Sequence, residues 1–112
     1  MAGGRDMDIE INKTIHERAR LMILTYVATR EETPVPFNEI KSALNMTGGN
    51  LSVQLRNLEE AGYVEVFKTI EKRKTVTRVS LTPKGYEDLL SYLDTMEKLI
   101  KDVSGAIEER GE

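Results

Sequence analysis

Apolar residues recur at intervals of three and four over the first part of the chain, which predicts an amphipathic helix from Ile9 to Arg30. A break near His16 would let the main helix begin there. The segment Glu31–Pro36 ends the helix, because proline cannot continue it and biases the preceding residue toward extended geometry. Residues 1–8 are expected to form a flexible lead-in. The apolar positions of this first helix are Ile11, Ile15, Ala19, Met22, Ile23, Tyr26 and Val27.

Two more helices are predicted before the pattern changes. A short helix follows the prolines and ends at the turn Asn45–Met46. Thr47 offers a hydroxyl as N-cap to the next helix, and Gly62 ends that helix as a left-handed C-cap. The apolar positions that define the two helices are Phe37, Ile40 and Leu44 in the first and Leu51, Leu55 and Leu58 in the second.

Short runs rich in β-branched and aromatic residues then predict two strands. These strands span Tyr63–Ile70 and Val76–Leu81, and in the second of them Val79 and Leu81 share one face. The connector Glu71–Thr75 is polar, which suits the tip of a hairpin.

The last helix shows the most regular pattern of the chain. Thr82 supplies its N-cap and Pro83 its first turn. Its apolar residues are spaced 3.5 positions apart on average, as in a coiled coil. About 25 residues of helix span roughly 40 Å, more than so small a core covers, so we expect a dimerisation helix over residues 83–109. The alternative is a helix folded back over its own domain. The predicted dimer contacts are Tyr86, Leu89, Leu93, Met96, Ile100, Val103 and Ile107.

This order of elements is that of a winged helix-turn-helix. The predicted fold class is α+β, mainly helical, with residues 9–82 as the DNA-binding domain, the long C-terminal helix after it and residues 110–112 as a tail. A helix of this kind fits the major groove of DNA, and a basic hairpin reaches adjacent phosphates or the minor groove.

The segment from Asn50 to Val64 resembles the recognition helix and following strand of MarR/ArsR-type winged-helix regulators, and within them the small archaeal and bacterial DNA-binding regulators. Its sequence, NLSVQLRNLEEAGYV, nearly preserves the run found in that group. Arg20–Leu24 is similar to the first helix of the family, and Thr77–Gly85 to its returning strand and last-helix start. The resemblance covers about residues 15–92 and implies a DNA-binding transcriptional regulator. Because Gln54 stands where many relatives carry His, base preference does not carry over.

The distribution of charge agrees with this interpretation. The whole chain has a net charge of −3. Residues 41–85 nevertheless contain eight cationic side chains and four carboxylates, a net charge of +4, so the remainder carries −7. A basic segment within an otherwise acidic chain is typical of a localised contact surface for nucleic acid.

Two sets of residues are predicted to contact DNA. One lies on the recognition helix, where Arg reads guanine, Asn or Gln reads adenine, and Val packs on a thymine methyl group. The other lies on the wing and contacts the sugar-phosphate backbone without reading sequence. The alternative for the helix residues is a face that is only solvated, and the alternative for the wing residues is a charged loop that only adds solubility. The first set is Asn50, Ser52, Val53, Gln54, Arg56 and Asn57; the second is Lys68, Lys72, Arg73, Lys74 and Arg78.

Enzymatic and metal-dependent functions find little support in the composition. There is no Cys and one His, His16, which excludes thiolate sites and multi-histidine sites within one chain. The acidic pairs are sequence neighbours that a helix splays apart, and Gly48–Gly49 lacks the strand and Lys of a nucleotide loop. We expect no catalysis, no cofactor and no membrane association, and a cytoplasmic location.

The sequence thus predicts a homodimeric, sequence-specific regulator that binds double-stranded DNA. One alternative is a winged helix that serves as a protein-interaction module of the transcription machinery. Another is a regulator with a small-molecule effector, bound in a pocket lined by Tyr26, Tyr86, Tyr92 or Met96. The operator, the effector and the direction of regulation are left open.

Overall fold

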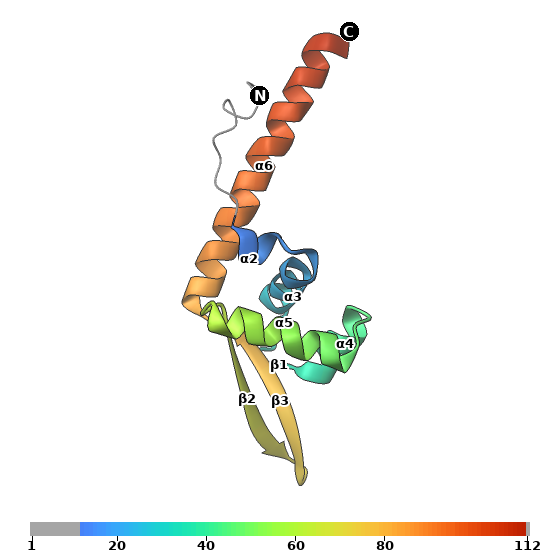
Figure 1. The fold of residues 1–112 in the computed structure, drawn as a ribbon, viewed down its shortest axis with the longest axis vertical. Coiled ribbons are helices and arrows are strands. Elements are labelled where there is room, and N and C mark those ends of the chain that lie inside the picture. Colours follow the sequence, from blue (N-terminus) through green and yellow to red (C-terminus); the bar gives the residue numbers. More distant parts are fainter. Residues whose placement is uncertain (1–11, 112) are drawn as a thin grey trace.

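The computed structural model describes residues 12–111 (Figure 1). The predicted lead-in and the first residues of the predicted first helix, from Ile9 to Ile11, lie outside this range. The predicted break is confirmed, since α2 (Lys13–His16) and α3 (Arg18–Thr29) are separate helices. Glu17 causes the break because its carboxylate accepts hydrogen bonds from the backbone N–H groups of Ala19 and Arg20, at 3.0 and 3.3 Å. These bonds cap α3 and hold Glu17 in extended geometry.

The helix-turn-helix follows the prediction closely. It consists of α4 (Phe37–Ala43) and α5 (Gly48–Glu60), and Asn45 adopts a positive φ of 54° in the turn between them. The Thr47 hydroxyl accepts from the N–H of Asn50 at 3.1 Å, which confirms the predicted N-cap. Gly62 has φ 83°, as a left-handed C-cap requires.

Three antiparallel strands form the sheet, in the order β1–β3–β2. The hairpin of β2 (Val64–Glu71) and β3 (Lys74–Leu81) is called the wing below. The predicted five-residue connector is wrong, because pairing continues to Glu71 and Lys74 and leaves a two-residue turn. The prediction also lacked β1 (Val35–Pro36), which exists only because Val35 pairs with Val79 of β3.

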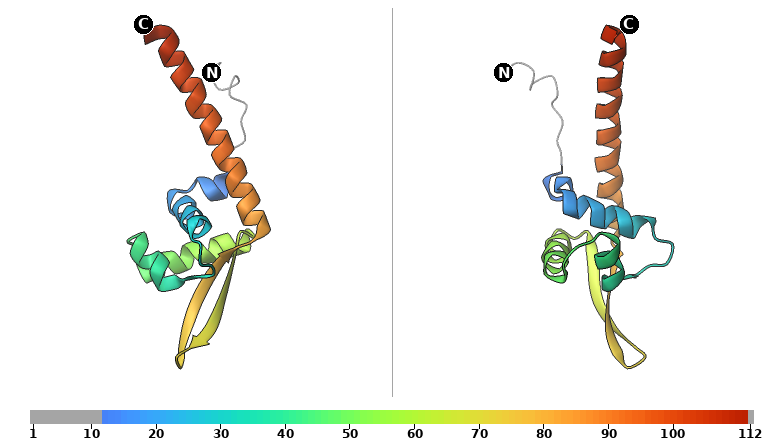
Figure 2. Two further views of the ribbon diagram at one scale, coloured as in Figure 1. Left: turned by 180° about the vertical axis from the view of Figure 1, so that it is seen from behind. Right: turned by 90° about the vertical axis from the view of Figure 1, so that its right-hand side faces the viewer.

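The last helix, α6, spans Pro83–Gly111 and so continues past the predicted end at residue 109 into the predicted tail. Figure 1 shows that α6 and the wing leave the helical core at opposite ends of the molecule, and Figure 2 shows the same from two other sides. The radius of gyration is 17.6 Å, against about 13 Å for a compact domain of this length. Two projecting elements explain the difference.

One core holds α2 to α5, the sheet and the first turns of α6 together. The predicted inward stripe of α5 is confirmed, since all three leucines are buried, and Val79 and Leu81 are buried as predicted for β3. The buried residues are Ile15, Ile23, Leu24, Val27, Val35, Ile40, Leu51, Leu55, Leu58, Tyr63, Val64, Val79, Leu81, Leu89 and Tyr92.

Candidate nucleic-acid interface

Helix α5 presents three rows of side chains around its buried stripe, because successive residues are rotated by about 100°. Asn50, Gln54 and Asn57 form the row on the α3 side. Ser52 and Arg56 lie on the opposite side, toward the wing. Val53 is directed away from the core and is 48% exposed. The predicted recognition residues are therefore all on accessible faces, in two flanking rows and one central position.

The row next to α3 is held by hydrogen bonds. Arg20 of α3 donates through Nε to Oε1 of Gln54 at 3.0 Å. Gln54 in turn donates through Nε2 to Oδ1 of Asn50 at 3.3 Å. Arg20 was not among the predicted site residues, because its place beside α5 comes from the packing of two helices and leaves no periodic signal in the sequence.

The two faces of the wing have different neighbours, because one face is turned toward α5 and the other is not. Side chains alternate along a strand, and directly paired residues of two strands share a face. The register pairs Lys68 with Thr77 and Ile70 with Thr75, on the face that continues from half-buried Val66. This face turns toward α5. Ile70 is 81% exposed there and was not predicted as a site residue.

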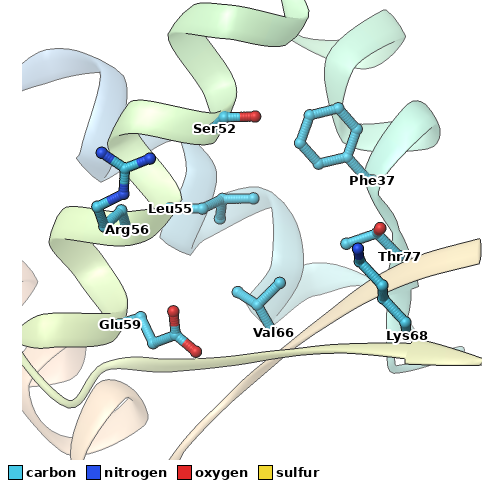
Figure 3. A pocket seen from close by; sticks show the side chains of 8 residues that line it. All are labelled: Phe37, Ser52, Leu55, Arg56, Glu59, Val66, Lys68 and Thr77. Carbon is cyan, nitrogen blue, oxygen red and sulfur yellow. The ribbon is translucent and has the colours of Figure 1, made fainter.

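A groove of about 390 Å³ separates α5 from this face of the wing. Figure 3 shows the α5 wall opposite the side chains of the wing. Hydroxyl groups and two cationic groups in such a groove suit an anionic backbone, because each offers a donor to phosphate oxygens. Phe37 and Thr77 contribute to the groove, although no pattern in the sequence predicts this role. The residues that line the groove are Phe37, Ser52, Leu55, Arg56, Glu59, Val66, Lys68 and Thr77.

The tip of the wing is cationic and conformationally unusual. Lys72 and Arg73 form the two-residue turn, with φ values of 50° and 65°. Both are exposed, as is Lys74 at the start of β3. A turn of this kind favours Asn-Gly, because both central residues need positive φ. The chain instead carries two bulky cationic side chains at a position where they are strained.

Arg78 lies on the other face of the wing and is bound within the protein. Its guanidinium group donates to both carboxylate oxygens of Glu71, at 2.7 and 2.8 Å, and to the carbonyl oxygen of Pro34 at 3.0 Å. The hydrogen bonds from Arg78 to Glu71, together with one from Thr69, lower the pKa of Glu71 from 4.5 to about 2. The pKa of Arg78 is raised by the same partner. Arg78, predicted as a DNA contact, thus braces the wing against the segment before β1, away from the groove.

The predicted dimer contacts of α6 separate into two groups. Leu89 is 3% exposed and belongs to the domain core, and Met96 packs against that core, so the fold-back alternative holds for the first turns of α6. The prediction of Leu89 as a dimer contact is wrong for this reason. Five of the other predicted contacts are exposed, both within the first turns of α6 and beyond Met96, and Leu90, which was not predicted, is exposed as well. The exposed members are Tyr86, Leu93, Ile100, Val103 and Ile107.

Two of the side chains predicted to line an effector pocket, Tyr26 and Tyr92, contact other residues of the domain. The hydroxyl of Tyr26 donates to Glu39 at 2.6 Å, and this contact raises the pKa of the phenol. Tyr92 is buried in the core. Within residues 12–111 there is no group of three or more His, Cys, Asp or Glu side chains placed to hold a metal ion. No helix in that range has the length and apolar character to cross a membrane.

Comparison with known proteins agrees with this geometry. A family model described as "Winged helix DNA-binding domain" matches residues 19–100. An uncharacterized protein of Methanocaldococcus jannaschii is 37% identical over 67 residues, which are 60% of this chain and 73% of that protein. The solved structure of a transcriptional regulator homologue from Pyrococcus horikoshii OT3 has 27% identity and a TM-score of 0.77, covering 92% of this chain and 98% of that one.

The fold is also that of MepR, a transcription regulator of a multidrug efflux pump in Staphylococcus aureus. Its complex with DNA matches with 21% identity and a TM-score of 0.60, over 94% of this chain and 71% of that one. The fold class predicted from the sequence and the resemblance to winged-helix regulators are both confirmed.

Proposed function

The chain belongs to the winged helix DNA-binding domain family, and we propose that it is a homodimeric transcriptional regulator that reads a pseudo-palindromic DNA sequence. In this proposal α5 enters the major groove and the wing contacts the backbone or the minor groove beside it. Each half of the dimer reads one half-site, and two half-sites lie about one helical turn apart.

The observation that carries the proposal is the open groove between α5 and the wing. The α5 wall provides Ser52 and Arg56, and the wing wall provides Lys68 and Thr77. One strand of a duplex fits between the two elements when α5 lies in the major groove. Phosphates then meet the hydroxyl groups and Lys68, while Arg56 and Val53 of α5 reach the base edges. Glu59 lines the same groove and disfavours phosphate at its own position, which sets a limit to the contact surface along α5.

The wing tip supports the second part of the proposal. Lys72 and Arg73 hold positive φ at an energetic cost of order 1 kcal/mol each. A strained position that retains large cationic side chains indicates a role outside the stability of the hairpin. Contact with the phosphate backbone is the role that their charge and exposure favour.

The dimer rests on the distal part of α6. Leu93, Ile100, Val103 and Ile107 recur in steps of seven, three and four, the spacing of a coiled-coil stripe. They are 40–65% exposed in the single chain. A second copy of α6 offers the same stripe, and a two-fold dimer buries both at once.

Selection of bound fragments from a random duplex library tests the proposal as a whole. We expect an enriched pseudo-palindrome with half-site centres about 10 base pairs apart. The substitution Arg56→Ala is then expected to relax base preference at one position per half-site, by about 5- to 100-fold in discrimination. Reversal of charge at Lys72, Arg73 and Lys74 is expected to weaken binding to all sequences and to flatten its dependence on salt.

The two variants serve as controls for each other, since one affects sequence preference and the other affects overall affinity. Unchanged affinity and preference in both variants would show that the assigned surface is wrong. Retention on random duplex DNA but no enriched sequence would leave a DNA-binding protein without sequence specificity. Absence of any binding would favour the protein-interaction alternative.

A further inference from the structure

We propose that Arg20 is a positioning residue for base reading: it fixes the side-chain amide of Gln54, so that Asn50 and not Gln54 reads the base on this side of α5. Arg20 lies on α3, outside the helix-turn-helix formed by α4 and α5. The inference rests on the proposed function, since it concerns how the proposed recognition helix selects a sequence.

The first step is the orientation of the Gln54 amide. A guanidinium group only donates hydrogen bonds. The Nε of Arg20, 3.0 Å from Oε1 of Gln54, therefore holds the amide oxygen toward α3. The amide nitrogen then faces along α5, where it donates to Oδ1 of Asn50 at 3.3 Å. Both ends of the Gln54 amide are thus engaged within the protein.

The second step concerns what each amide has left for DNA. An amide reads adenine bidentately when its oxygen accepts from N6–H and its nitrogen donates to N7. Gln54 has its oxygen on Arg20 and is half-buried, so it is poorly placed for this pairing. Asn50 is exposed and accepts from Gln54 through its oxygen, which leaves its NH₂ group directed outward as a donor.

The third step identifies the base that the NH₂ donor of Asn50 selects. Guanine presents two neighbouring acceptors, N7 and O6, in the major groove, whereas cytosine presents an amino donor there. The structure therefore assigns to Asn50 a preference for guanine and a discrimination against cytosine. Without Arg20 the Gln54 amide is free to rotate, and the preference set by this chain of hydrogen bonds is lost.

The test is a double-mutant cycle with sequence preference as its readout. Arg20→Met removes the donor at similar length, and Arg20→Lys is the conservative variant that retains a cationic donor. Each is made in the wild-type chain and in the Gln54→Leu variant. Affinities are measured by competition with duplexes that carry each of the four base pairs at the selected positions, at several salt concentrations.

We expect Arg20→Met to reduce discrimination at one base pair per half-site by about 5- to 10-fold, with the salt dependence unchanged, and Arg20→Lys to restore most of it. In the Gln54→Leu background, Arg20→Met should have no further effect, because the group that it positions is absent. Circular dichroism of each variant checks that the fold is retained.

Three results would overturn the inference. A uniform loss of affinity with a salt slope smaller by about one would show that Arg20 contacts a phosphate directly. The same loss in both backgrounds would show that Arg20 acts independently of Gln54. A lower melting temperature with unchanged discrimination would show a purely structural role. If the wild-type chain selects no sequence, the proposed function fails as well, whereas selection that is indifferent to Arg20 refutes this inference alone.

Discussion

The wing and the distal part of α6 both project from the core, toward opposite ends of the molecule (Figure 1). The wing tip presents cationic side chains and one isolated apolar residue, Ile70, which is 81% exposed. The distal α6 presents apolar residues that recur at coiled-coil spacing, with charged residues such as Lys98 and Lys101 paired to carboxylates on its other faces. The outer part of each projection extends beyond the buried core.

The difference indicates which partner each projection takes. A lone exposed apolar residue is ordinary on a protein surface, whereas a periodic row of them requires a second apolar surface. Cationic groups at a strained turn attract a polyanion, whereas the same groups of a second copy would repel them. Under the proposed function the wing contacts DNA and the distal part of α6 self-associates, and the following experiments separate these roles.

The largest effect is expected from the apolar stripe of α6. Leu93→Glu with Ile100→Glu should convert the proposed dimer to a monomer, as measured by light scattering, because four carboxylates would be buried in each dimer interface. Affinity for a two-half-site operator should fall by about 10²- to 10³-fold, since linked binding of two sites is lost.

Ser91→Glu with Lys98→Gln is the matched control for that experiment. It changes the net charge by the same −2 on the opposite face of α6, where both residues are exposed. This control should remain dimeric. A dimer that survives in the Leu93→Glu, Ile100→Glu variant would mean that the chains associate through another surface.

The second effect concerns the junction from which both projections begin. A Cβ at Gly85 would overlap the carbonyl oxygen of Tyr63, at the start of α6 and next to β2. Gly85→Ala should therefore destabilise the whole domain by about 3 kcal/mol, as measured by chemical denaturation. Gly105→Ala is the control, because nothing lies within 4 Å of its added Cβ, and it should stabilise α6 slightly. Equal stability of the two variants would show that the junction adjusts without cost.

The third prediction is that replacement of the wing-tip turn raises the stability of the protein and lowers its DNA affinity. Lys72→Asn with Arg73→Gly provides the Asn-Gly pair that a turn with two positive φ values favours. The melting temperature should rise by roughly 4–8 °C per kcal/mol of strain removed. DNA affinity should fall by roughly 10-fold, with a salt slope smaller by up to about two.

Lys98→Gln with Lys101→Gln removes the same charge from α6 and serves as the control for the wing-tip variant. It should leave DNA affinity nearly unchanged, because these residues lie on the projection that faces away from the wing. A more stable wing variant that retains full affinity would show that the wing tip does not contact DNA.

The smallest effect is expected from the brace between Glu71 and Arg78. Because the pKa of Glu71 is lowered from 4.5 to about 2, the pair stabilises the wing above about pH 4.5, and this contribution is lost as the pH falls through about 2. An NMR titration of the Glu71 carboxyl carbon should show a midpoint near 2. Arg78→Met should return the midpoint toward 4.5, whereas Lys68→Met, on the other face of the wing, should not. Identical titrations in the two variants would remove Arg78 as the cause.

Much of the fold was predictable because its signals are local. The cap at Thr47, the left-handed Gly62 and the leucine stripe of α5 each depend on a few neighbouring residues, and all three are confirmed. The turn between β2 and β3 was predicted too long, because pairing across a hairpin extends strands into residues that show no strand preference of their own.

The sequence by itself determined the order of the helices and strands, the faces that they bury and the concentration of positive charge between residues 41 and 85. These properties follow from periodicity and composition, which act over short distances along the chain. Only the tertiary structure decided that Arg78 is hydrogen-bonded to Glu71 and that Leu89 is buried in its own domain. It also decided that Arg20 is hydrogen-bonded to Gln54, which lies 34 positions later in the sequence. Such contacts depend on how whole elements pack against one another, and a charge or an apolar side chain has the same appearance in the sequence whether its partner lies within the domain or outside it.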